Sequence, residues 1–122
     1  MDIIKSVEIN KNILDKLKEM GGYGDRLGTF AVIKFKEVPN QPYMNKKGVE
    51  IINSIFMLMG FGHEYGGIES DTDFQEAVDC FVSIDDNVLT MRHKYWPWSK
   101  CQMFIDLLGV FCRHHNVEMR VE

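Results

Sequence analysis

The stretch that decides the expected fold is residues 76–122, EAVDCFVSIDDNVLTMRHKYWPWSKCQMFIDLLGVFCRHHNVEMRVE. Apolar residues alternate along 78–84 and again along 88–95, which is typical of half-buried strands. The turn residues Asp85-Asp86-Asn87 separate the two segments. The pattern therefore predicts a β-hairpin.

A helix and a last strand are expected after the hairpin. Ser99 followed by Gln102 fits a capping box, and Asn116 fits a left-handed C-cap. Steps of three and four between apolar residues predict one buried stripe, which consists of Cys101, Phe104, Ile105, Leu108, Phe111, Cys112 and His115. The alternating residues of 117–121 then predict the closing strand.

The earlier residues supply a second strand–helix pair. Residues 29–38 are rich in β-branched and aromatic side chains and predict a strand, and 46–59 has the apolar spacing of a helix. A further helix is expected over 10–20, whereas 2–9 fits a short strand or a helical lead-in. The sequence thus predicts one α+β domain, 1–122, with a ferredoxin-like split βαβ fold: four antiparallel strands in the order 4-1-3-2, two helices on one face and an extra N-terminal helix.

Composition favours an ordinary soluble globular protein. The chain has 122 residues, 45% of them hydrophobic, and a net charge of −4, so diffuse attraction to nucleic acid or anionic membrane is weak. Three cysteines without a CxxC pair predict buried reduced thiols in a cytoplasmic protein. No apolar run is long enough to suggest a signal peptide or a membrane span.

Catalytic and metal motifs are absent from the sequence, so no catalytic residue, metal or cofactor is predicted. The four histidines have no metal-ligand spacing, and the cysteines fall on expected core faces. Polar groups that could bind a small molecule or an anionic ligand, or carry out acid–base chemistry, gather only in the loop 61–74, at His63, Glu64 and Tyr65. A solvated acidic loop explains the same residues.

The expected sheet has one face without helices, and this face is the main candidate for function. If the apolar alternates point to the helices, the open face gathers five cations and two phenylalanines, the full set being Phe30, Val32, Lys34, Lys36, Phe81, Thr90, Arg92, Lys94 and Arg120. Trp96 is expected to be an exposed anchor at the strand end, and Trp98 to be structural.

The sequence therefore favours a small non-enzymatic cytosolic binding protein, of inhibitor or regulatory type, that docks a protein partner. The predicted contact residues are Phe30, Lys34, Lys36, Phe81, Arg92, Lys94, Trp96 and Arg120. Three alternatives stay open: the loop site already described, a homodimer packed sheet to sheet, and a nucleic-acid-binding sheet, although VLTMRHKYW lacks the RNP1 glycine and paired aromatics.

Overall fold

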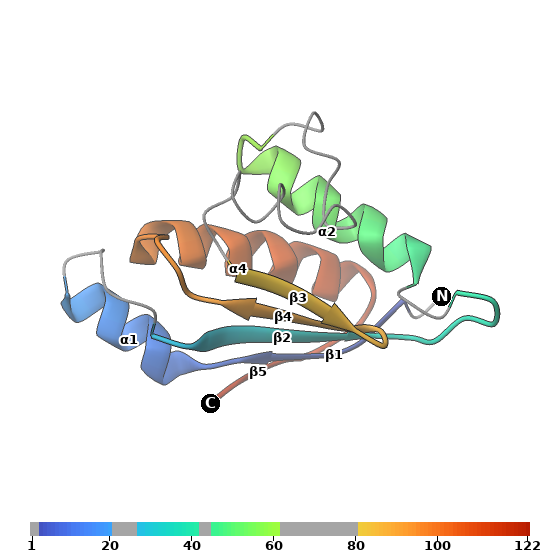
Figure 1. The fold of residues 1–122 in the computed structure, drawn as a ribbon, viewed down its shortest axis with the longest axis horizontal. Helices are drawn as coiled ribbons and strands as arrows, with labels where there is room; N and C mark the ends of the chain where they lie inside the picture. The colour runs from blue at the N-terminus through green and yellow to red at the C-terminus, as the bar shows by residue number, and fades with distance from the viewer. Residues whose placement is uncertain (1–2, 21–26, 42–44, 62–80) are drawn as a thin grey trace.

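The structure is a computed structural model of the whole chain, and it describes residues 3–20, 27–41, 45–61 and 81–122. Within these residues, helices and strands are combined around one hydrophobic core (Figure 1). The α+β class expected from the sequence is confirmed.

The described strands form one five-stranded sheet in the order β3-β4-β2-β1-β5. Neighbouring strands are antiparallel, except that β5 runs parallel to β1. The strands are β1 (Ile4–Ile9), β2 (Thr29–Phe35), β3 (Phe81–Asp85), β4 (Val88–Arg92) and β5 (Met119–Val121).

The described helices are α1 (Lys11–Glu19), α2 (Lys46–Leu58) and α4 (Trp98–His114). Figure 1 shows α2 and α4 on the same side of the sheet, while α1 lies at one end of the sheet. No helix covers the opposite face in the part of the chain that the structure describes.

The predicted four-stranded, wholly antiparallel sheet is wrong. Residues 4–9, for which the sequence left two interpretations open, form β1 and pair with both β2 and β5. The four expected strands keep their relative order, but β1 separates β5 from β2. The sheet therefore gains a parallel edge and differs from the four-stranded ferredoxin-like arrangement.

The predicted hairpin between β3 and β4 is confirmed. Asp86 and Asn87 have φ values of 48° and 65°, the left-handed pair that a type I′ turn requires. The turn is tied to the rest of the sheet and to α2, because Phe35 N–H donates to Asn87 O (2.8 Å) and Asn45 N–H donates to Asn87 Oδ1 (2.6 Å).

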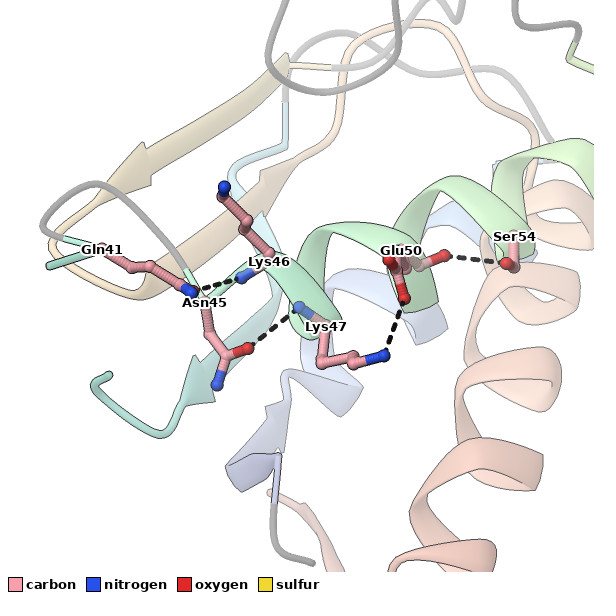
Figure 2. A network of polar contacts seen from close by, with 6 residues as sticks. All are labelled: Gln41, Asn45, Lys46, Lys47, Glu50 and Ser54. Atoms are coloured by element: carbon pink, nitrogen blue, oxygen red, sulfur yellow. Dashed lines mark hydrogen bonds and ion pairs between the residues drawn. The ribbon is translucent and has the colours of Figure 1, made fainter. Parts of the chain in front are cut away.

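The first turn of α2 is capped by polar side chains, as Figure 2 shows. Asn45 Oδ1 accepts from Lys47 N–H (2.9 Å), and Gln41 Oε1 accepts from Lys46 N–H (2.9 Å). The Asn45 side chain also donates to Lys36 O (2.9 Å), which joins the helix start to the end of β2. These bonds satisfy amides that a helix N-terminus otherwise leaves unpaired.

Helix α4 confirms the expected apolar stripe but not the expected cap. The helix begins at Trp98, directly after Pro97, and no side chain caps it. Gln102 Nε2 donates instead to Asp106 Oδ1 (2.9 Å), so the predicted capping box is wrong. At the other end, Asn116 is left-handed (φ 57°) as expected, and Val117 N–H donates to Cys112 O (2.8 Å).

Candidate functional site

The register of the sheet assigns each strand residue to one of its two faces. On β2, Ala31, Ile33 and Phe35 are buried on the face that α2 and α4 cover. Val32 and its cross-strand partners Glu8 and Thr90 therefore lie on the other face. This open face is formed by Ser6, Glu8, Val32, Lys34, Ser83, Asp85, Val88, Thr90, Arg92 and Arg120.

The open face has a partly apolar centre and a charged border. Its β-branched residues Val32, Val88 and Thr90 are half-buried on the adjacent inner strands β2 and β4. The charged side chains of the face are exposed, and they are the cations Lys34, Arg92 and Arg120 and the carboxylates Glu8 and Asp85. Among the described residues, the face thus carries a small excess of positive charge, on a chain whose net charge is −4.

Phe30 does not belong to this face, and its predicted exposure is wrong. The pairing of β2 with β4 shifts between Thr29 and Ala31, which leaves Phe30 as the extra residue of a β-bulge. Its side chain is 0% exposed, and its ring packs edge-on to Phe104 of α4 at a centroid distance of 6.3 Å. Phe30 is therefore a core residue on the helix side of the sheet.

Trp96 is also buried, against the sequence expectation. Its side chain is 1% exposed and stacks on Phe61 with a centroid distance of 6.2 Å and an interplanar angle of 7°. Trp98 is half-buried instead, with Lys18 Nζ 4.9 Å from its ring centroid. Trp96 therefore cannot serve as an exposed anchor, whereas Trp98 packs against the edge of the core, in keeping with its expected structural role.

The remaining predicted contact residues are placed as follows. Lys34, Arg92 and Arg120 are exposed on the open face, and Lys36 is exposed one position beyond β2. Lys94 lies beyond the end of β4, with its ammonium 5.2 Å from the Tyr95 ring centroid.

Four predicted site residues lie at the end of a described range or outside the described residues. Phe81 occupies the register position opposite Arg92 on the edge strand β3. His63, Glu64 and Tyr65 lie outside the described residues, so the alternative loop site stays a prediction.

Sequence reasoning missed the contribution of β1 to the open face. Ser6 and Glu8 lie beside Lys34 and Val32 in the sheet, and Arg120 pairs with Glu8 rather than with β2. The alternation of Val7, Glu8 and Ile9 was the available signal, but it is only three residues long.

The described cysteines are placed in the core, as expected. Cys101 is 0% exposed and Cys112 is 1% exposed. Burial raises the pKa of Cys101 to about 12 and that of Cys112 to about 11, although Arg113 partly opposes the second rise. Both thiols are therefore protonated at neutral pH and have no access to a substrate.

His93 is buried and hydrogen-bonded at both ring nitrogens. Nε2 lies 2.9 Å from Trp96 O, and Nδ1 accepts from Leu27 N–H at 3.4 Å. With Nδ1 accepting from Leu27 N–H, Nε2 is the ring nitrogen that donates to Trp96 O. His93 thus connects the end of β4 to the segment that precedes β2, which is a structural role.

The described residues contain no group of three or more His, Cys, Asp or Glu side chains placed to hold a metal ion. Among the same residues, no helix combines the length and apolar character needed to cross a membrane. The fold and the site together define an α+β protein whose described sheet is bare on one face. Comparison of the chain with protein-family models, curated proteins and solved structures gave no match.

Proposed function

We propose that this chain is a non-enzymatic cytosolic binding protein that docks a protein partner through the open face. The observation that carries the proposal is the composition of that face: Lys34, Arg92 and Arg120 surround half-buried β-branched residues on the side of the sheet that no described helix covers. The partner we infer has an acidic surface, since carboxylates complement this border.

The arrangement resembles the general plan of a protein–protein interface. Such interfaces place apolar side chains at the centre and polar or charged ones at the rim. Here Val32 and Thr90 are direct cross-strand neighbours on β2 and β4, and Lys34 and Arg92 follow them toward the two ends of the face. The centre would supply contact area, while the charges would orient the partner and speed its association.

The buried position of Phe30 argues against the nucleic-acid alternative. A sheet that stacks bases uses exposed aromatic side chains on its central strands. Phe30 is the aromatic side chain of β2 that was expected on the open face, but it is buried and packs against Phe104 and Trp96. The protein partner is therefore preferred.

The test of this proposal is the double charge reversal Lys34→Glu/Arg92→Glu. Tagged wild-type and variant chains are used to capture partners from the native cell, and each captured protein is then purified and its affinity measured directly. The expected result is a partner that binds the wild type and loses at least about 100-fold in affinity for the variant, since two rim charges change sign.

The matched control is Lys11→Glu/Lys46→Glu, which makes the same charge change at the first positions of α1 and α2, outside the open face. This control should keep wild-type affinity. Equal binding by both double variants, or equal loss in both, would overturn the proposal. A dimer mass in light scattering, abolished by Lys34→Glu/Arg92→Glu, would replace the partner by a second copy of the chain.

A further inference from the structure

A cleft of about 680 Å³ lies at one edge of the sheet, where β1, the end of β2 and the link between α4 and β5 meet. We call it the edge cleft, and its polar lining includes Lys5, Ser6, Lys36, His115, Glu118 and Arg120. A volume of this size falls within the range of small-molecule sites.

The edge cleft exists because the last strand is shorter than its neighbour. β1 begins at Ile4, but its pairing with β5 begins only at Val7, opposite Met119. In the part of the chain that the structure describes, the first residues of β1 therefore have a strand partner on the β2 side alone. Main-chain groups at this end of β1 are thus left to solvent or to a ligand.

Cations from three separate segments of the chain line the edge cleft. Lys5, Lys36 and Arg120 are all exposed, and they outnumber the two carboxylates of the lining, Glu37 and Glu118. No ion pair joins any of these five side chains to another described residue. An excess of unpaired positive charge in a concave site attracts anions even on an acidic protein.

The C-terminus of α4 would oppose an anion if its last carbonyl groups were unpaired. Three of them accept hydrogen bonds in this structure: Phe111 O from His115 N–H (3.0 Å), Cys112 O from Val117 N–H (2.8 Å) and Arg113 O from Asn116 N–H (3.3 Å). The helix end is therefore largely satisfied, and the side chain of His115 adds a donor to the lining.

We propose that the edge cleft binds a small molecule through an oxyanion group, a phosphate or a carboxylate. The guanidinium of Arg120 forms two parallel hydrogen bonds to the anion, and Lys5 and Lys36 contribute point charges on either side. Ser6 and His115 supply further hydrogen-bond donors. Arg120 and Ser6 also border the open face, but Lys5, Lys36 and His115 belong to the cleft alone, and the two proposals are tested on different pairs of side chains.

The experiment is a titration of the ¹⁵N-labelled chain with inorganic phosphate and, separately, with succinate, at ionic strength matched by sodium chloride. The expected result is saturable shifts of the amide signals of residues 4–6, 36–37 and 115–120 with at least one of the two anions. In Lys36→Gln/Arg120→Gln the affinity should fall by about tenfold or more, because charge-assisted hydrogen bonds are lost.

The control Lys11→Gln/Lys46→Gln removes the same charge elsewhere and should bind like the wild type. Binding of phosphate alone would assign a phosphorylated ligand, and binding of succinate alone a carboxylate. No saturable shift with a Kd below about 10 mM, or shifts spread equally over Lys11, Lys16 and Lys46, would overturn the proposal. Either outcome leaves the Lys34→Glu/Arg92→Glu test of partner docking unaffected.

Discussion

Replacement of Trp96 by alanine tests the aromatic packing of the core most directly. The indole is 1% exposed and lies 6.1–6.2 Å, between ring centroids, from four phenylalanine rings on β2, α2, α4 and the segment after α2. Truncation of a buried aromatic to alanine typically costs about 3–5 kcal/mol, because transfer free energy is lost and a cavity stays behind. We expect Trp96→Ala to lose about 4 kcal/mol of the free energy of unfolding.

The matched comparison is Trp98→Ala. Trp98 is only half-buried at the edge of the core, and Lys18 Nζ lies 4.9 Å from its ring centroid. Partial loss of burial and of an exposed cation–π contact should cost about 1–2 kcal/mol. Trp96→Phe keeps an aromatic ring in the cluster and should fall between the two alanine variants.

The assay is urea unfolding followed by far-UV circular dichroism, with the m-value checked for each variant. A loss of this size can unfold a domain of ordinary stability. If Trp96→Ala fails to fold, the free energies of unfolding of Trp96→Phe and Trp98→Phe are compared instead, and Trp96→Phe should be the less stable. Iodide quenching of fluorescence supplies a second readout. Trp96 is the one tryptophan left in Trp98→Phe, and its emission should resist quenching by iodide. A larger loss in Trp98→Ala than in Trp96→Ala would refute this description of the core.

Two further predictions concern other parts of the same core. A Cβ at Gly48 would lie 2.5 Å from Cδ1 of the Phe35 ring. Gly48→Ala should therefore destabilise the protein by about 1–3 kcal/mol, measured by thermal unfolding. An unchanged Tm would contradict the close packing of α2 on β2. Cys101 and Cys112 should resist alkylation at neutral pH in the folded chain, as resolved by peptide mass spectrometry. Burial raises their pKa values from 9.0 to about 12 and about 11. The stability that the buried thiols contribute is therefore full below pH 9 and is lost as the pH rises through the folded-state pKa values. Equal free energies of unfolding at pH 8 and pH 11.5 would contradict this.

The hairpin and the helices could be predicted because their patterns are long and regular. The helical stripe of α4 spans several turns, and Asp86-Asn87 supplies the left-handed residues that the hairpin turn needs. The strand β1 could not be assigned, because its buried residues Ile4, Val7 and Ile9 have spacings of three and two. The bulge between Ile4 and Ser6 produces this irregular spacing, which fits neither a strand nor a helix.

The misplacement of Phe30 has the same physical origin. Strict alternation along β2 assigns Phe30 to the face of Val32 and Lys34, but a bulge adds one residue and moves every position before it to the opposite face. Nothing in the local composition marks this bulge. Phe30 packs against Trp96 and Phe104, which lie more than sixty positions away in the sequence, so its burial could not be predicted from its own segment.

The inserted strand also changes which charges can act together. The sequence expectation put Arg120 beside β2, in one patch with Lys34 and Lys36. With β1 in between, Arg120 pairs with Glu8 on the open face and shares the edge cleft with Lys36, whereas Lys34 and Arg92 lie on the central strands. One expected patch is thus divided into two sites, the open face and the edge cleft. An extended sheet face suits a macromolecular surface and a cleft suits a small anion, and for that reason the two pairs of cations are mutated separately.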